Sequence, residues 1–453
     1  MELTEKIFLV AGTGISGIGA TKLLLDKGAN VILYDGNESL DEKNIREQFD
    51  ETARLTIILG ELKKEQIQEV EAMIISPGIP CDTPFVLLVQ DMGIPIWSEI
   101  ELAYQMGKGK IIAITGTNGK TTTTALVGKI MNDYYKQVFV VGNIGTPYTS
   151  IVEETEEESV IVAEISSFQL ETIKQFQPVV SAVLNVTPDH LNRHKTMELY
   201  ADVKMSIAKN QTKQQVCVLN YDDPITRKMG DKVPAKPIFF SHTKQLEEGV
   251  FLREDTIYIK KDGVEHRVCQ TNELKLLGMH NIENVMAGVG MAVWFGVPLS
   301  SVITSIKQFQ AVEHRIEYVD TIRGVDYYND SKGTNPDAAI KGIKAMNRPT
   351  YLIGGGYDKG GAFDEWIQAF EGKVKELVLL GETANRIAET AKQYGFVDVV
   401  FVETLSEAVQ YCAKKATDGE AVLLSPACAS WGMFKNYEER GHMFKQYVEN
   451  LKE

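Results

Sequence analysis

Short runs rich in valine and isoleucine alternate with longer amphipathic segments along almost the whole chain. Runs such as Ile7–Ala11, Val31–Asp35 and Ile111–Thr115 are typical of buried strands in a parallel sheet, and the segments between them are typical of the helices that cover it. The pattern changes near residues 235–270, where three short runs and the Asp262-Gly263 turn predict a small antiparallel set of strands. We therefore expect an α/β protein built largely from βαβ units.

The length of 453 residues corresponds to roughly three domains. A GKGK loop at Gly107–Lys110 reads as a hinge, and a third alternating block begins near Glu313. Domains are therefore predicted at residues 1–108, 109–312 and 313–453. Within them, Ala182–Val186 and Arg315–Asp320 are expected to be strands.

Charge and cysteine content exclude several classes of function. The chain has 47 basic and 62 acidic residues, a net charge of −15, which disfavours nucleic-acid and anionic membrane surfaces as partners. There is no apolar run of about 18 residues, so no membrane insertion is expected. The five cysteines are scattered without a CxxC pair, which is typical of a protein in the reducing cytoplasm and not of a disulfide or zinc framework.

The first glycine motif, Gly12-Thr13-Gly14-Ile15-Ser16-Gly17, follows a predicted strand and opens a predicted helix. Glycines at such a turn let the backbone approach a phosphate closely, and Asp35 at the end of the next strand is placed to accept from a ribose. The motif is consistent with NAD, with another diphosphate ligand, or with a tight turn that binds nothing.

A second glycine loop carries a stronger signal. The buried strand Ile111–Ile114 runs into the sequence TGTNGKTT, which is followed by an amphipathic helix. Backbone N–H groups in such a loop hold phosphates, the lysine offsets charge, and the threonine hydroxyl reaches Mg²⁺. The usual pattern would place its first glycine where Ile114 stands, so this is a shorter variant. The predicted ATP-binding residues of the loop are Gly116, Thr117, Asn118, Gly119, Lys120, Thr121 and Thr122.

Two further residues stand at the ends of neighbouring predicted strands. Glu164 ends one strand, and His190 follows the next. In an open α/β sheet, ligands bind at the carboxyl ends of the strands. Beside a phosphate loop, the two side chains are therefore predicted to bind Mg²⁺.

The full set of motifs resembles the Mur ligases. The segments that carry the resemblance are GTNGKTT, GNIG (Gly142–Gly145), EISSFQLE (Glu164–Glu171), NVTPDHLNRH (Asn185–His194), GMHNIEN (Gly278–Asn284), His314-Arg315, NDSKGTNPDA (Asn329–Ala338) and SPACASWGMFKNYEERG (Ser425–Gly441). They cover essentially the whole chain in the family's order, and they are most similar to the branch that adds D-glutamate. The resemblance implies a UDP-binding Rossmann-like domain, a central P-loop ATPase domain with the small antiparallel sheet, and a C-terminal Rossmann-like domain that binds the amino acid.

The resemblance also implies roles for individual residues. It reassigns the first glycine loop from NAD to a UDP diphosphate, and it makes Lys120, His190 and Lys204 catalytic. Lys204 matches a carbamylated lysine that binds metal with Thr121, Glu164 and His190, whereas its own helical context predicts a solvent-facing side chain. The implied UDP-substrate residues are Gly14, Ile15, Ser16, Asp35, Ser76, Gly78, Asn143 and His190. Further ATP residues are Asn281, Asn284, Arg315 and Asp330, and the D-glutamate residues are Lys332, Thr334, Lys359, Ser430 and Tyr437, the last standing where phenylalanine is expected.

The implied activity is the ATP-dependent ligation of D-glutamate to UDP-N-acetylmuramoyl-L-alanine through an acyl phosphate, by a cytoplasmic monomer that uses two Mg²⁺ ions in peptidoglycan synthesis. One alternative is a sister ligase that adds another amino acid, or a folylpolyglutamate synthetase, against which the segments Asn329–Ala338 and Ser425–Ser430 argue. A nicotinamide-dependent dehydrogenase would leave the second glycine loop, Glu164 and His190 without a role. A catalytically silent nucleotide sensor is the third alternative.

Overall fold

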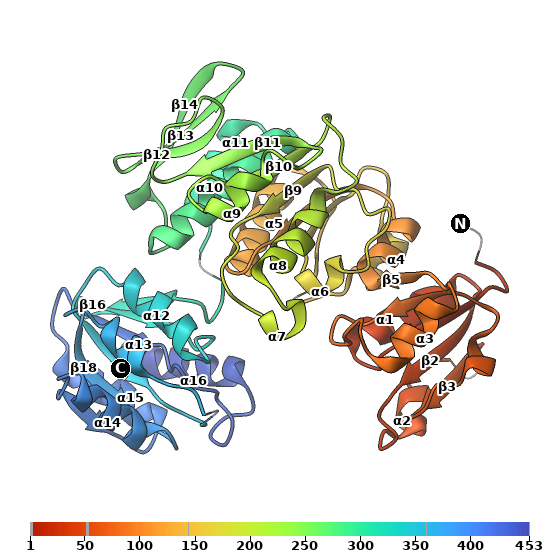
Figure 1. The fold of residues 1–453 in the computed structure, drawn as a ribbon. Coiled ribbons are helices and arrows are strands. Elements are labelled where there is room, and N and C mark those ends of the chain that lie inside the picture. Colours follow the sequence, from red (N-terminus) through yellow and green to blue (C-terminus); the bar gives the residue numbers. More distant parts are fainter. Residues whose placement is uncertain (1–2, 51–53, 144, 311, 359, 453) are drawn as a thin grey trace. The chain divides into compact units, whose positions relative to one another are not determined.

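A computed structural model describes residues 3–50, 54–143, 145–310, 312–358 and 360–452. The chain divides into two compact units. The first comprises Met1–Glu273 with Glu283–Lys307, and the second comprises Leu274–Ile282 with Gln308–Glu453. Figure 1 shows the elements of both units along the chain. Within the described residues, no helix is long and apolar enough to cross a membrane.

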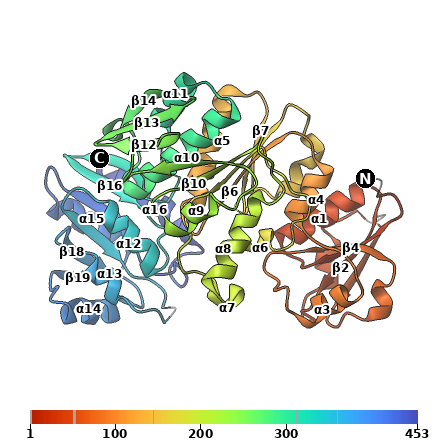
Figure 2. The same ribbon diagram turned by 45° about the horizontal axis from the view of Figure 1, so that its top comes forward.

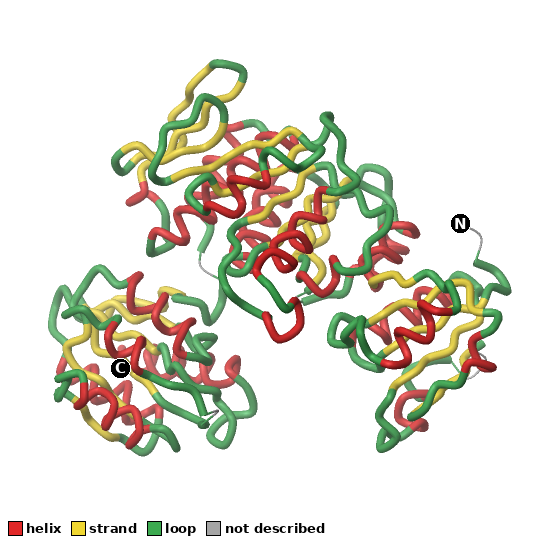
Figure 3. Tube along the Cα trace, in the orientation of Figure 1, coloured by secondary structure: helices red, strands yellow, loops and turns green. Residues whose placement is uncertain are grey.

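The first sheet, in the first unit, is wholly parallel and has the strand order β3-β2-β1-β4-β5. Its strands are β1 (Ile7–Ala11), β2 (Asn30–Asp35), β3 (Leu55–Leu59), β4 (Val70–Ile75) and β5 (Ile96–Ser98). The accompanying helices are α1 (Ile15–Asp26), α2 (Glu42–Arg46), α3 (Pro84–Asp91) and α4 (Glu99–Met106). Figure 3 shows helices lying against the strands of this sheet. The predicted βαβ unit around the first glycine loop is therefore confirmed.

The second sheet, also in the first unit, has nine strands in the order β14-β13-β12-β11-β10-β9-β6-β8-β7, and Figure 2 shows β10, β6 and β7 in sequence across it. Its strands are β6 (Lys110–Thr115), β7 (Val138–Gly142), β8 (Val160–Glu164), β9 (Val180–Val183), β10 (Val216–Asn220), β11 (Lys236–Ser241), β12 (Gly249–Arg253), β13 (Thr256–Lys261) and β14 (Val264–Gln270). The accompanying helices are α5 (Lys120–Tyr134), α6 (Ser167–Leu170), α7 (Leu191–His194), α8 (Met197–Met205), α9 (Pro224–Met229), α10 (Met279–Phe295) and α11 (Leu299–Gln308).

The predicted antiparallel strands form, but not as a separate small sheet. Strands β12, β13 and β14 pair antiparallel, with Asp262 and Gly263 both at positive φ in the predicted turn. Strand β12 then pairs parallel with β11, so the three strands extend the edge of the second, nine-stranded sheet (Figure 1). Gly249 permits this pairing, because a Cβ there would lie 2.2 Å from the backbone oxygen of Phe239.

The third sheet, in the second unit, has the order β15-β16-β20-β17-β18-β19, in which only the β15–β16 pair is antiparallel. Its strands are β15 (Glu317–Ile322), β16 (Val325–Asn329), β17 (Thr350–Gly354), β18 (Val374–Leu379), β19 (Val399–Phe401) and β20 (Ala421–Leu424). The helices are α12 (Pro336–Ala345), α13 (Asp364–Gln368), α14 (Ala384–Gln393), α15 (Leu405–Lys415) and α16 (Tyr437–Glu449). Two buried apolar clusters follow from the alternation along its strands: Leu352 and Leu377 pack with α12, α13 and α14, and Ile353 and Val378 pack with α15 and α16.

Two predicted strands are displaced in the structure. Strand β15 begins at Glu317 and not at Arg315, because His314 and Ile316 adopt positive φ values of 63° and 48° that a strand does not allow. Strand β9 ends at Val183 because the residues after it bond to the phosphate loop: Thr117 N donates to Asn185 O at 2.9 Å. In both places a local backbone constraint, and not the hydrophobic pattern, sets the end of the strand.

Candidate functional site

The phosphate loop connects β6 to α5, as the glycine–lysine pattern predicts. Gly116 and Gly119 have positive φ values of 155° and 84°, which let the chain turn tightly into the helix. Lys120 Nζ donates to the backbone oxygens of Gly116 at 2.8 Å and Thr117 at 3.0 Å, so its ammonium group lies over the loop. Thr121 and Thr122 follow in the first turn of α5.

Residues from two other segments hold this loop in place. Asn185 is one that the sequence did not single out: its Oδ1 accepts from Asn118 N at 2.8 Å, and its Nδ2 donates to Asn118 O at 3.1 Å. Asn284 of α10 packs against the loop, since a Cβ on Gly119 would lie 2.3 Å from Asn284 Oδ1. A loop tied in this way is preorganised for phosphate.

Glu164 and Asn143 meet at the ends of β8 and β7. Asn143 Nδ2 donates to Glu164 Oε1 at 3.1 Å, and Asn143 N donates to Glu164 O at 2.8 Å. The Glu164 side chain is buried. The predicted substrate residue is thus hydrogen-bonded directly to the predicted metal ligand.

Lys204 is buried, so the solvent-facing position suggested by its helical context is wrong. Its side chain lies over the Tyr200 ring, and Nζ donates to Gly116 O at 2.9 Å, the same oxygen that Lys120 binds. Burial, with a smaller contribution from the neighbouring Lys120 ammonium, lowers the pKa of Lys204 to about 6. The amine is therefore largely neutral at physiological pH, the form that can attack carbon dioxide.

His190 lies at the start of α7 with a positive φ of 52°. Its half-exposed ring packs on Phe168, and Nε2 is 3.5 Å from Asp189 Oδ2. Lys120 and Lys204 thus both donate to one carbonyl of the phosphate loop, that of Gly116. His190 lies on the loop that follows Asn185.

Arg193, which sequence reasoning missed, joins two parts of the first unit. Its guanidinium donates to the backbone oxygens of Pro77 at 2.8 Å and Ile79 at 3.0 Å, pairs with Glu171 at 2.5 Å, and lies over the Phe168 ring. Its position three residues after His190 in the NVTPDHLNRH segment was the available signal. The arginine therefore connects the Ser76–Ile79 loop to the segment that carries His190.

A cavity of about 580 Å³ lies beside the first glycine loop. Within the loop, a Cβ on Gly17 would lie 1.8 Å from Gly12 O, so only glycine allows this turn. Asp35 Oδ2 accepts from Thr13 N at 3.1 Å and from Thr13 Oγ1 at 2.8 Å, which fixes its carboxylate at the cavity wall. Seven of the eight predicted UDP-substrate residues line this cavity, His190 being the exception: Gly14, Ile15, Ser16, Asp35, Ser76, Gly78 and Asn143.

The second unit holds Asp330 in a buried polar cluster. Asp330 Oδ2 accepts from Ser425 Oγ at 2.7 Å, and Oδ1 accepts from Ile316 N at 3.3 Å. Burial raises the pKa of Asp330 to about 7. Beside it, Arg440, which was not predicted, is buried and donates to Ser331 O at 2.8 Å and to Cys428 O at 3.2 Å.

The predicted D-glutamate residues are partly assembled in the same unit. Lys332 Nζ lies 5.4 Å from the centre of the Tyr437 ring, and Ser331 Oγ donates to Tyr437 O at 2.8 Å. Ser430 is buried, and Thr334 precedes helix α12. Lys359 lies outside the described residues. Asn281, also in this unit, donates from Nδ2 to Leu277 O at 2.8 Å, and Arg315 follows His314 in the positive-φ segment.

Comparisons with known proteins agree on one family. Three family models match successive parts of the chain: the Mur ligase MurD-like N-terminal domain over residues 6–98, the Mur ligase middle domain over 114–292, and the Mur ligase glutamate ligase domain over 314–428. Two relatives, both named UDP-N-acetylmuramoylalanine–D-glutamate ligase, are 55% identical in Lachnoclostridium phytofermentans and 52% identical in Lachnospira eligens, each covering 100% of both chains.

Solved structures share the fold at low sequence identity. A UDP-N-acetylmuramate-alanine ligase from Thermotoga maritima has a TM-score of 0.59 at 19% identity, covering 98% of this chain and 99% of its own. A MurF ligase from Thermotoga maritima in complex with ADP has a TM-score of 0.59 at 17% identity, covering 99% and 96%. With full-length relatives above half identity and three family models in succession, the chain belongs to the Mur ligase family.

Proposed function

We propose that this chain joins D-glutamate to UDP-N-acetylmuramoyl-L-alanine at the expense of ATP, giving ADP and phosphate. One geometric observation carries the proposal: Asn143 lines the cavity beside the first glycine loop and also hydrogen-bonds to Glu164. A UDP-sugar in that cavity would point its reactive end toward the phosphate loop. The full-length identity to ligases of that name supports the choice of D-glutamate.

The proposed reaction begins with the L-alanine carboxylate, which attacks the γ-phosphorus of ATP and expels ADP. The Lys120 ammonium offsets the repulsion between the two anions. The D-glutamate amine then attacks the acyl carbon, loses a proton, and expels inorganic phosphate from the tetrahedral intermediate. Because an acyl phosphate hydrolyses in water, the site must exclude water during these steps.

Thr121, Glu164, His190 and Lys204 are the residues we propose to hold Mg²⁺, with two ions in all. The donor set fits a hard cation, since Glu164 is a buried carboxylate and Lys204 is a buried amine with a lowered pKa. Addition of carbon dioxide to that amine forms an N–C bond, releases a proton and leaves a carbamate anion. Mg²⁺ supplies charge neutralisation to the transferring phosphoryl group.

The remaining assignments follow the same proposal. We assign UDP binding to residues 1–108, ATP binding to 109–312 and D-glutamate binding to 313–453, limits that enclose the three matched ranges. The ATP site is completed, in this proposal, by Asn281, Asn284, Arg315 and Asp330. The D-glutamate site is assigned to Lys332, Thr334, Lys359, Ser430 and Tyr437. A cytoplasmic monomer is proposed, and the five free cysteines support a reducing compartment.

Phosphate release tests the activity directly. The full chain is mixed with ATP, Mg²⁺ and UDP-N-acetylmuramoyl-L-alanine, and a panel of amino acids is added one at a time. Release should require D-glutamate and should be lost in Lys120→Ala. With ¹⁸O in the L-alanine carboxylate, the released phosphate should carry one ¹⁸O atom. Release driven by L-alanine or a diamino acid would identify a sister ligase, and unlabelled phosphate would exclude the acyl phosphate.

A further inference from the structure

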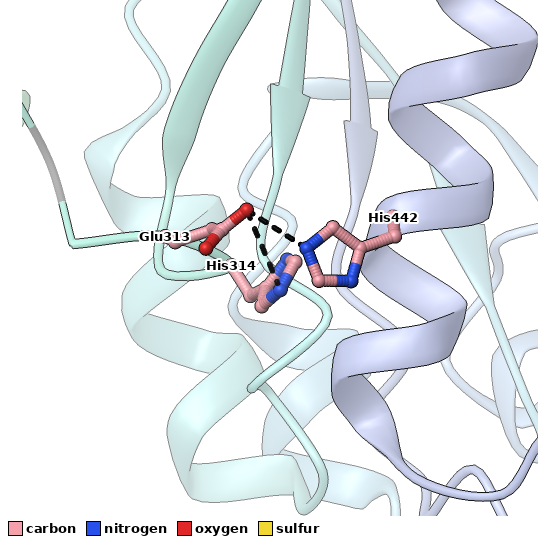
Figure 4. Close-up of side chains that lie close together, drawn as sticks. All are labelled: Glu313, His314 and His442. Carbon is pink, nitrogen blue, oxygen red and sulfur yellow. Dashed lines mark ion pairs between the residues drawn. The ribbon is translucent and has the colours of Figure 1, made fainter. Parts of the chain in front are cut away.

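Three side chains outside the proposed substrate sites place metal-ligating atoms together in the second unit. Glu313 and His314 precede β15, and His442 lies on α16. Glu313 Oε1 is 3.0 Å from His442 Nε2 and 3.9 Å from His314 Nε2, and all three ligand atoms lie within 4.8 Å of one another. Figure 4 shows the carboxylate directed toward both imidazole rings.

His314 contributes the observation that distinguishes this group from an ordinary surface ion pair. Its ring is buried, and Nε2, on the edge facing Glu313, has no hydrogen-bond partner within the part of the chain that the structure describes. The ring is also fixed in place, because a Cβ on Gly441 would lie 2.2 Å from His314 Nδ1. A buried nitrogen without a partner is costly, so a ligand for it is to be expected.

The backbone of His314 is held as firmly as its ring. His314 N donates to Glu317 Oε2 at 2.9 Å, and His314 O accepts from Lys332 N at 3.0 Å. These bonds keep the residue at its positive φ of 63°. The imidazole is therefore a preorganised ligand.

A second group of this kind, Asp222, His242 and Glu283 in the first unit, differs in burial and in its contacts: His242 Nδ1 also has no hydrogen-bond partner among the described residues, but its side chain is 30% exposed, against 3% for His314. Asp222 already accepts from Ser241 Oγ and His242 N, both at 2.7 Å. His242 Nδ1 stands 2.9 Å from both carboxylates, as a shared counter-ion would. We read that group as an ion-pair cluster within the described chain.

We propose that Glu313, His314 and His442 form a binding site for a zinc-class divalent ion, with His314 Nε2, His442 Nε2 and one Glu313 oxygen as ligands. Two imidazoles and a carboxylate suit Zn²⁺ or Co²⁺ and not Mg²⁺, which prefers oxygen. The side chains of Glu313 and His442 are 51% and 55% exposed, so a water can complete the coordination and the ion can exchange.

Two neighbours must adjust when the ion binds. Lys445 Nζ lies 2.5 Å from Glu313 Oε1 but also 3.1 Å from Glu317 Oε1, so it can release the first carboxylate and keep the second. A metal on His314 Nε2 requires the ring proton on Nδ1. Asn329 Nδ2 lies 2.9 Å from Nδ1 and must turn away when that nitrogen carries the proton. Glu317 Oε2, 3.9 Å from Nδ1, is then the carboxylate that can accept the N–H, and a carboxylate behind a metal-bound histidine raises the basicity of the ligand.

Titration of the full chain with Zn²⁺, in excess Mg²⁺ and without substrates, tests the site. One equivalent should bind to the wild type. His442→Asn should weaken binding at least tenfold, and the exposed His266→Asn serves as the matched control that leaves it unchanged. Lys445→Met removes the competing cation and should tighten binding. The His442 side chain is 55% exposed and that of Lys445 24% exposed, and neither residue is part of the buried core, so these variants should fold.

X-ray absorption of the bound zinc supplies the independent readout. Two imidazole ligands and no sulfur are expected. Equal affinity in the wild type and His442→Asn, no tightening in Lys445→Met, or a sulfur ligand would each overturn the proposal. Because the titration uses no substrate, its failure would leave the proposed ligase activity untouched, and failure of phosphate release would leave this site untouched.

Discussion

Replacing Arg193 by methionine should destabilise the first unit and weaken the UDP-substrate site together. The arginine pairs with Glu171, with side-chain exposures of 12% and 15%. Removing one partner of a buried ion pair costs about 3–5 kcal/mol, and the remaining solvent screening lowers this to about 2–3 kcal/mol. Methionine keeps much of the apolar contact with Phe168, so the loss reports mainly the charge and its hydrogen bonds.

The effect on binding follows from the two carbonyl groups that Arg193 holds. Pro77 and Ile79 flank Gly78, and all three residues line the cavity. Once released, the loop must be ordered by the ligand itself, which should weaken the affinity for UDP-N-acetylmuramoyl-L-alanine about tenfold, equivalent to about 1.4 kcal/mol. The affinity for ATP should stay unchanged, because the phosphate loop is tied to Asn185 and not to Arg193.

Urea unfolding and calorimetric titration measure the two effects on the same protein. Arg193→Lys can restore one charge contact but not both hydrogen bonds to the carbonyl groups. Its unfolding free energy and its affinity for the UDP substrate should therefore fall between those of the wild type and Arg193→Met. The exposed Arg227→Met on α9 is the control and should change the unfolding free energy by less than about 0.5 kcal/mol. The reasoning is refuted if Arg193→Met has the same unfolding free energy as the control. It is also refuted if the variant lowers the affinity for ATP as much as the affinity for the UDP substrate.

Three further changes address the remaining parts of the site. Lys204→Ala should abolish phosphate release, and a small carboxylic acid in solution should restore part of it; full activity without the acid would contradict the metal-bridging role. Gly119→Ala should raise the KM for ATP several-fold, since its Cβ would meet Asn284 Oδ1 at 2.3 Å in a positive-φ position, and unchanged kinetics would show that the loop can shift freely. Asp330→Asn should stabilise the protein increasingly as the pH rises from 3.8 to about 7, because burial raises the Asp330 pKa to about 7 and the unfolded carboxyl therefore ionises first. The gain should reach at most about 4 kcal/mol at pH 8 and be small at pH 4 by urea unfolding, and a gain independent of pH would rule out the ionisation of Asp330 as its cause.

Local patterns were sufficient to predict the parts of the fold that depend on neighbouring residues. The turn at Asp262-Gly263 and the strand–loop–helix unit around Lys120 both depend on glycine positions and on hydrophobic periodicity within a few residues. The attachment of β12 to β11 was not predictable in this way. It depends on the fit of Gly249 against the Phe239 carbonyl, which is a contact between separate strands.

Burial of single charged side chains was the main gap in the prediction of the site. Lys204 lies on the short helix α8, which carries polar residues on more than one face, so the helix sequence does not mark Lys204 as buried. Its hydrogen-bond partner is the Gly116 carbonyl, 88 residues earlier in the chain. Arg193 and Arg440 likewise bind backbone oxygens, which have no signature in the sequence. For Lys204 the resemblance to a family compensated for this, because a matched position carries tertiary information that spacing within one segment does not.

The net charge of −15 is compatible with anionic substrates for a structural reason. Among the described residues that line the cavity beside the first glycine loop there is no lysine or arginine, and the one charged side chain, Asp35, is engaged by Thr13. A diphosphate there must be bound by backbone N–H groups at the start of α1, whose partial positive charge needs no basic residue. The cation that the proposed phosphoryl transfer needs is instead Lys120, whose ammonium group lies on the Gly116 carbonyl of the phosphate loop. The chain can therefore keep an acidic surface, since neither of these anion sites depends on surface charge.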